Sequence, residues 1–310
     1  MLANVLGLTG CALVLLFASK IVYKEIIAIA KALQVPVFVV SLLLVAFSTS
    51  IPELFVGITS AIQGTPAFSL GDIFGSNIVN LTFIAGLVMV LGRKEIALPH
   101  DISSKLLLST FAIASAPVFL LLDGTLSRFD GVLLLGAYAL YVFFIVSDRH
   151  HVYTSFTRKN NGGLFRSLMI FLVGVGLLVI SAEMIVHIAS NMSKALYITP
   201  FVIGVFAIAF STSLPELAFG LRAALQRTPE LSLADLVGSS AVNASGILGI
   251  VALIHPIAPL NLHGALFTGF FGVFTFLVFF LLIGRERVKP SRGAIMLILY
   301  PIFVSFSLIV

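Results

Sequence analysis

The chain is built largely from apolar runs that are each close in length to a membrane-spanning helix. Such a helix needs about 20 mostly apolar residues to cross the hydrocarbon core. Charged residues make up only 10% of the 310 residues, whereas a soluble globular chain carries about 25%. We therefore expect an all-α integral membrane protein with ten transmembrane helices. The expected segments are 2–18, 36–62, 70–92, 104–122, 130–147, 166–190, 199–225, 232–254, 264–283 and 292–309.

The positions of lysine and arginine predict how these helices are oriented, because cytoplasmic loops carry an excess of both residues. If the ten segments cross in turn, all but two of the 18 Lys and Arg residues lie on the side opposite the termini, the exceptions being Arg128 and Lys194. We therefore expect a multi-pass protein of the plasma membrane with both termini extracellular. Residues 148–165 would be a cytoplasmic linker between two five-helix units, 1–147 and 166–310.

Two segments of the chain, 46–80 and 209–243, repeat one sequence at an offset of 163 without a gap, and are identical at 20 of 35 positions. Because each predicted unit has an odd number of helices, the second copy enters the membrane from the opposite side. Inverted repeats are typical of secondary transporters, which bind substrate at the midplane where the repeats meet. Duplication retained only for folding would not explain why the best-matched stretch is also the most polar.

Each copy contains the motif Ser-Thr-Ser-x-Pro-Glu inside an apolar segment, ending at Glu53 and Glu216. Proline interrupts helical hydrogen bonding, so carbonyls near Ala46 and Ala209 should be released. A carboxylate at membrane depth costs about 2.5–3.5 kcal/mol on insertion scales, and no Lys or Arg recurs beside either glutamate. A bound cation would offset this cost, and a donor set made only of oxygen favours Ca²⁺ or Na⁺. The alternative is a pair of protonated glutamic acids that only tie helices together.

The second half of each copy places a polar stripe on one face of a helix. Asp72, Ser76 and Asn80 are spaced i, i+4 and i+8, and residues at this spacing share a face. The second copy repeats the stripe with Asp235, Ser239 and Asn243. Ser76 and Asn80 lie deep enough in the segment to meet Glu53. The aspartate of each stripe follows a serine by three residues, as in a capping box, and this interpretation is favoured over an ion-access funnel.

The paired Thr-Ser-x-Pro-Glu and Gly-Ser-x-x-x-Asn blocks resemble the alpha repeats of the sodium/calcium exchanger family. The resemblance implies a ten-helix inverted-repeat fold and an antiporter that exchanges Na⁺ for Ca²⁺ by alternating access. It also implies that the protein is no enzyme and uses no cofactor beyond the transported ions. The implied metal ligands are the Ala46 and Ala209 carbonyls with Thr49, Ser50, Glu53, Ser76, Asn80, Thr212, Ser213, Glu216, Ser239 and Asn243.

One departure from the family pattern bears on stoichiometry. Asn80 and Asn243 are both neutral, whereas exchangers often carry aspartate here in one or both repeats. Two glutamates balance one Ca²⁺ or two Na⁺, so three Na⁺ would leave a net positive charge.

The main alternative function is a proton-coupled exchanger of Ca²⁺ or another divalent cation. An intramembrane enzyme is disfavoured because no nucleophile–base pair is evident, and a passive channel needs no inverted repeat. The expected partners are Ca²⁺ and Na⁺ ions and membrane lipid, without nucleic acid, and a monomer is the working expectation.

Overall fold

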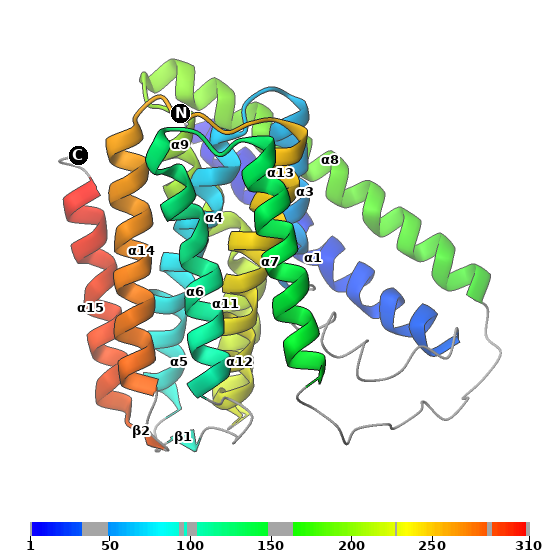
Figure 1. Cartoon of the computed structure of the whole chain (residues 1–310). Coiled ribbons are helices and arrows are strands. Elements are labelled where there is room, and N and C mark those ends of the chain that lie inside the picture. Colours follow the sequence, from blue (N-terminus) through cyan, green and yellow to red (C-terminus); the bar gives the residue numbers. More distant parts are fainter. Residues whose placement is uncertain are drawn as a thin grey trace.

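The computed structural model describes residues 2–32, 49–92, 96–97, 104–147, 164–226, 228–283 and 287–307. These residues form a bundle of helices, with one pair of two-residue strands at one end of the bundle (Figure 1). Residues 36–48 of the second predicted segment and 148–163 of the predicted linker lie outside the described residues.

The described residues of the first half are mostly helical. Its elements are α1 (Leu2–Ala32), α3 (Ile51–Ile62), α4 (Ala67–Val79), the π-helix η1 (Asn80–Ile84), α5 (Ala85–Leu91), β1 (Ile96–Ala97), α6 (Ser104–Leu120), the 3₁₀ turn η2 (Leu121–Asp123) and α7 (Arg128–Ser147). The predicted first segment ends too early, since α1 continues from position 18 to Ala32. From α4 through α5 the chain forms one continuous, mostly apolar helix that contains a π-helical turn.

The described residues of the second half are also mostly helical. Its elements are α8 (Leu164–Leu196), α9 (Pro200–Ile203), the π-helix η3 (Gly204–Ile208), α10 (Ala209–Thr212), α11 (Leu214–Leu225), α12 (Pro229–Ala241), the π-helix η4 (Val242–Ile247), α13 (Leu248–Ile254), α14 (Leu262–Ile283), β2 (Arg287–Val288) and α15 (Pro290–Ser307). The strand of this half follows α14, whereas β1 precedes α6. Because α8 begins at Leu164, the predicted linker ends two residues earlier than position 165.

Several helices in the described part of the chain are suited by length and hydropathy to cross a membrane. Five qualify as single helices: 67–91, 164–196, 229–254, 262–283 and 290–307. A sixth candidate is the pair Pro200–Thr212 and Leu214–Leu225, whose axes differ by 43°. This bend lies at Ser213, two residues before Pro215, so the predicted break in the second repeat is confirmed. The chain is therefore an all-helical, multi-pass integral membrane protein apart from its short strand pair.

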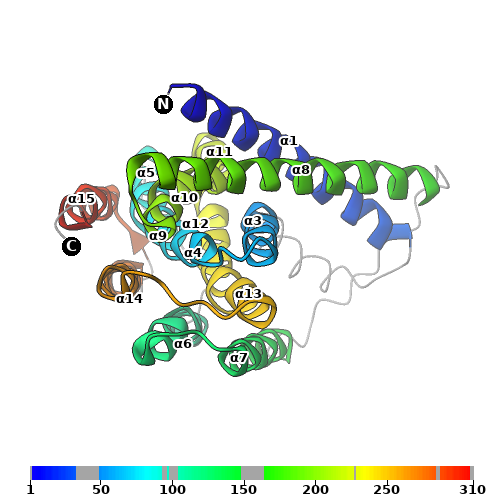
Figure 2. The same cartoon turned by 90° about the horizontal axis from the view of Figure 1, so that it is seen from above.

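The helices are arranged in layers around a central group. Seen from above, α1 and α8 cross one side of the bundle, α6, α7 and α14 cover the opposite side, and α3, α4, α11 and α12 lie between them (Figure 2). The outer pair packs through an apolar face of α8 that includes Leu178, Ala182, Ile185 and Ala189. That spacing of three and four residues is the one a single helical face requires.

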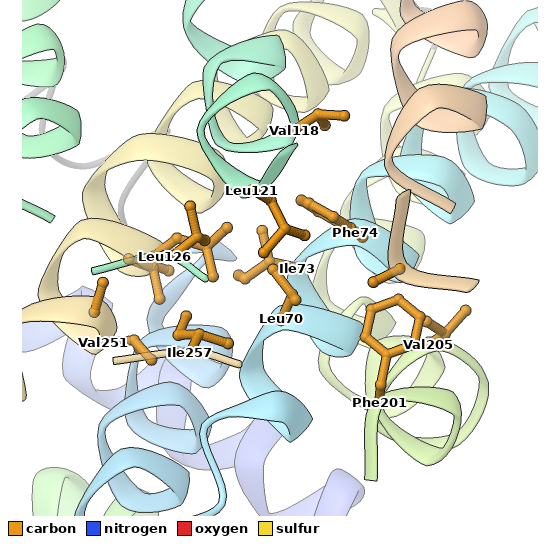
Figure 3. Close-up of a cluster of buried hydrophobic side chains, with 14 of the residues drawn as sticks. Leu70, Ile73, Phe74, Val118, Leu121, Leu126, Phe201, Val205, Val251 and Ile257 are labelled. Atoms are coloured by element: carbon orange, nitrogen blue, oxygen red, sulfur yellow. The ribbon is translucent and has the colours of Figure 1, made fainter. Parts of the chain in front are cut away.

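Close packing of α4 against the second half sets the depth of the polar stripe. Leu70, Ile73 and Phe74 of α4 lie in an apolar cluster with residues of η2, α9 and α13 (Figure 3). On another part of α4, a Cβ added at Gly71 would lie 2.1 Å from the carbonyl oxygen of Phe201. Only glycine permits the helices to approach this closely, and the approach brings α4 into contact with the bent helix of the second repeat.

Short strand-like contacts join the two halves at each end of the bundle. Ile96 and Ala97 pair with Val288 and Arg287 at one end, and Leu126 bridges to Ile257 at the other (Figure 1). Leu126 and Val288 are equivalent at the offset of 162 that relates the ends of the two units. Equivalent loops thus lie at opposite ends of the molecule.

Candidate functional site

The polar residues of both repeats are buried together among the central helices. Glu53 lies in the first turn of α3, and Glu216 lies in the first turn of α11. The stripes lie on α4–η1 and α12–η4. Exposure is 0% for Glu53, Asp72, Ser76, Asn80, Thr212, Glu216, Ser239 and Asn243, and at most 2% for Ser50, Ser213 and Asp235.

The two helices that carry the glutamates begin with the same backbone geometry. Ser50 precedes α3 with φ −85° and ψ 5°, and Ser213 precedes α11 with φ −77° and ψ 4°. In each case the proline is the second residue of the new helix, where its missing N–H costs nothing. The repeated motif therefore starts a helix with its glutamate in the first turn, beside the N-terminal end of the helix dipole, which favours negative charge.

Side chains from one half are hydrogen-bonded to side chains from the other. The Thr212 hydroxyl donates to Asp72 Oδ1 at 2.8 Å, and Ser76 donates to the same oxygen at 3.2 Å. The Thr49 hydroxyl correspondingly donates to Asp235 Oδ1 at 3.3 Å and lies 3.0 Å from Ser239 Oγ. Each repeat thus contributes a threonine to one such group and an aspartate with a serine to the other.

The carboxylates of the two glutamates have no hydrogen-bonding partner. Both side-chain oxygens of Glu53 and of Glu216 are buried and unpaired, and the two groups repel each other electrostatically. Among the described side chains, no Lys, Arg or His is buried. Unpaired buried charge is costly, so this arrangement is suited to a positive ion.

Asparagine and serine side chains add further buried polar atoms that have no hydrogen-bonding partner. Both amide atoms of Asn80 and Asn243 lack partners, as do the hydroxyls of Ser50 and Ser213. Each asparagine lies in the first two residues of a π-helix, η1 or η4. Turns of this kind occur frequently at functional sites, and nothing in the sequence pattern indicated them.

Two features of the predicted site are wrong. Asp72 and Asp235 are not helix caps: α4 and α12 begin after Pro66 and Thr228 without a side-chain cap, and both aspartates bind residues of the opposite repeat. The Ala209 carbonyl is also not released, since it accepts the Ser213 N–H at 3.0 Å. Proline at position 215 lacks the N–H that would pair four residues back, at Ser211, rather than at Ala209.

Of the remaining predicted ligands, Thr49 contacts Ser239 and Thr212 contacts Ser76 across the two repeats, and Ala46 lies outside the described residues. Across the described ranges, no three His, Cys, Asp or Glu side chains converge as a compact metal-holding cluster. Hydroxyl, amide and carboxylate oxygens of several helices share the site instead. Such a mixed set of hard oxygen donors suits Na⁺ and Ca²⁺ and does not suit soft or imidazole-binding metals.

Buried acidic groups inside apolar, broken helices define a class of protein, the ion-coupled membrane transporters. A sequence model of the sodium/calcium exchanger protein family matches residues 3–147 and 166–309. The chain therefore belongs to the sodium/calcium exchanger family and is a cation/Ca²⁺ antiporter rather than an enzyme. The ions are its substrates, and it uses no bound cofactor.

Similar proteins cover nearly the whole chain. Inner membrane protein YrbG of Escherichia coli (strain K12) is 27% identical, with 94% of this chain and 92% of the relative aligned. Sodium/calcium exchanger MaX1 of Methanosarcina acetivorans is 27% identical over 91% of both chains. A solved structure of the sodium-calcium exchanger NCX_Mj, soaked with Na⁺ and Sr²⁺, is 26% identical with a TM-score of 0.67, covering 98% of this chain and 99% of that one.

Proposed function

We propose that this protein exchanges Na⁺ for Ca²⁺ across the plasma membrane by alternating access. The observation that carries the proposal is the pair Glu53 and Glu216, one from each repeat, whose four carboxylate oxygens are buried and unpaired. They lie among oxygen donors only, and no buried basic side chain in the described part of the chain neutralises them.

The proposed ion ligands are those of the two repeated motifs. Ca²⁺ takes 6–8 oxygen ligands, and two carboxylates with neighbouring amide and hydroxyl oxygens can supply them. Na⁺ would use the hydroxyls at the helix breaks together with the same glutamates. The full proposed set is Glu53, Glu216, Thr49, Ser50, Ser76, Asn80, Thr212, Ser213, Ser239 and Asn243, with the Ala46 carbonyl and the Ala209 carbonyl. The Ala209 carbonyl accepts the Ser213 N–H and would offer its second lone pair to an ion. Because both ions need the same two glutamates, they compete, and competition at an alternately exposed site is sufficient for exchange.

Alternating access is proposed to follow from two inverted five-helix units, 1–147 and 166–310, that together cross the membrane ten times. The equivalent loop contacts at opposite ends of the bundle support the inversion. The Lys and Arg distribution supports extracellular termini, and the site is complete within one chain, which supports a monomer. Exchange of the two units between conformations would expose the shared site to either side.

The test is Ca²⁺ uptake by purified protein in liposomes loaded with Na⁺ and diluted into Na⁺-free buffer. We expect uptake that requires the outward Na⁺ gradient and is lost in Glu53→Gln and in Glu216→Gln. Glu183→Gln is the matched control, because it makes the same change at an exposed glutamate of α8 and should transport normally. No uptake with Na⁺, or uptake driven equally by a pH gradient alone, would refute Na⁺ coupling. Normal uptake by both site variants would remove the glutamates from the site.

A further inference from the structure

Two buried aspartates outside the proposed ligand set each hold a threonine hydroxyl that belongs to it. Asp72 Oδ1 accepts a hydrogen bond from Thr212 Oγ1 at 2.8 Å, and Asp235 Oδ1 accepts one from Thr49 Oγ1 at 3.3 Å. Asp72 and Thr212 are both 0% exposed, so bulk water does not compete for their hydrogen bond; Asp235 is 1% exposed and Thr49 is half-buried. We propose that Asp72 and Asp235 are positioning residues that orient these hydroxyls of the opposite repeat toward the transported cation. This inference rests on the cation exchange proposed above.

A hydroxyl group has one proton to donate and two lone pairs that accept. A proton donated to Asp72 leaves Thr212 with only lone pairs to present elsewhere. A cation requires lone pairs and is repelled by a hydroxyl proton pointed toward it. The aspartate therefore fixes the direction of the threonine hydroxyl proton before an ion arrives. Binding sites need this kind of preorganisation.

The Thr212 hydroxyl needs a fixed acceptor because other acceptors lie close to it. Thr212 Oγ1 also lies 3.3 Å from the carbonyl oxygens of Ile208 and Ala209 in its own helix. Neither Glu53 oxygen accepts a hydrogen bond. Asp72 provides the shortest contact. Without it, the proton can turn to the Ala209 carbonyl and occupy a lone pair that the ion would use.

The second repeat is arranged in the same way. Asp235 accepts a hydrogen bond from the Thr49 hydroxyl, and both side-chain oxygens of Glu216 are unpaired. Ser76 and Ser239 extend the two groups, lying 3.4 Å from Thr212 and 3.0 Å from Thr49. The recurrence of one arrangement at both repeat interfaces indicates a shared role in ion binding rather than an accident of packing.

A double-mutant cycle separates positioning from a direct electrostatic or ligand role. The variants are Asp72→Ala, Thr212→Val and the double variant, and the readout is the Ca²⁺ dissociation constant of purified protein in lipid nanodiscs, measured by calorimetry. We expect each single variant to weaken binding about tenfold, the loss of one charge-assisted interaction. The double variant should bind about as weakly as the weaker single variant, because Asp72 acts through Thr212.

The matched control combines Asp72→Ala with Thr49→Val, which alters the same residue types without a shared hydrogen bond. Here the losses should multiply to about a hundredfold. Thr212→Ser keeps a hydroxyl and should retain wild-type binding. If the Asp72/Thr212 pair is as additive as the Asp72/Thr49 pair, the aspartate is a direct ligand or a simple charge, and the positioning role is overturned.

Folding and the proposed function are checked separately. Size-exclusion profiles identify variants that do not fold, and Asp72→Leu, which keeps a similar side-chain size without an acceptor oxygen, then replaces alanine in the same cycle with the same expectation. If the wild type binds Ca²⁺ and Glu53→Gln does not, while the cycle is additive, only the positioning role fails. If the wild type does not bind Ca²⁺, both proposals are overturned.

Discussion

Replacing Gly71 with alanine tests whether close contact between α4 and the second half maintains the site. The added Cβ would lie 2.1 Å from the Phe201 carbonyl oxygen, 2.9 Å from the Val205 nitrogen and 3.0 Å from the Gly204 Cα. All three are backbone atoms, so no side chain can rotate away. The helices must separate to relieve the overlap, which weakens both the apolar packing around α4 and the Asp72–Thr212 hydrogen bond.

The magnitude follows from two opposing effects. Overpacking costs about 1–3 kcal/mol and occasionally more, while alanine gains up to about 1 kcal/mol over glycine in a helix. We therefore expect Gly71→Ala to lower the free energy of unfolding by about 1–2 kcal/mol and to weaken Ca²⁺ binding several-fold. Gly176→Ala in α8 is the matched control, since a Cβ there meets nothing within 4 Å, and it should be neutral or slightly stabilising.

The assay can use the single cysteine of the chain, because there is no tryptophan to report unfolding. Cys11 is 7% exposed, so a thiol-reactive dye should label it only when the packing of α1 opens. Thermal labelling curves should shift to lower temperature for Gly71→Ala and not for Gly176→Ala. Coincident curves for the two variants, with unchanged Ca²⁺ binding, would refute the idea that this contact positions the site.

Three further predictions concern coupling, capping and thiol reactivity. If three Na⁺ exchange for one Ca²⁺, one net charge moves per cycle, worth about 2.3 kcal/mol per 100 mV, so imposed membrane potentials should change the uptake rate; voltage-independent uptake would indicate two-for-one exchange. Ser127→Ala removes the reciprocal cap with Asp130 at the start of α7 and should cost about 1 kcal/mol of stability, with unchanged Ca²⁺ affinity in binding measurements on the folded fraction. Maleimide labelling of Cys11 should be slow in native protein and fast in denaturant, and rapid native labelling would contradict the packing of α1 on α8.

The sequence pattern was sufficient to predict helices, the break before Glu216 and the polar stripes, because each of these depends on local chemistry along one segment. The spacing of Asp72 and Ser76 placed them on one face, and their hydrogen bond at 3.2 Å confirms it. A repeat also predicts that matched residues occupy matched environments, which holds for Glu53 and Glu216.

What the sequence could not supply was the partner of each polar face. Spacing shows which residues share a face of one helix, but Asp72 is matched to Thr212 by packing between halves of the chain. The capping-box interpretation therefore placed the partner of Asp72 three residues away, whereas its partner Thr212 lies 140 positions away in the sequence. The π-helical turns at Asn80 and Asn243 were also unforeseen, because one extra residue per turn leaves no distinct mark on apolar periodicity.

The shared construction of the two hydrogen-bonded groups has a consequence for the ancestry of the chain. Neither half contains a complete group, because the aspartate and serine come from one repeat and the threonine comes from the other. A shorter ancestor with only one half would have had to dimerise, and the proposed inversion would have required its two copies to insert in opposite directions. Fusion of the duplicated genes would have fixed that pairing within a single polypeptide and allowed the two copies to diverge.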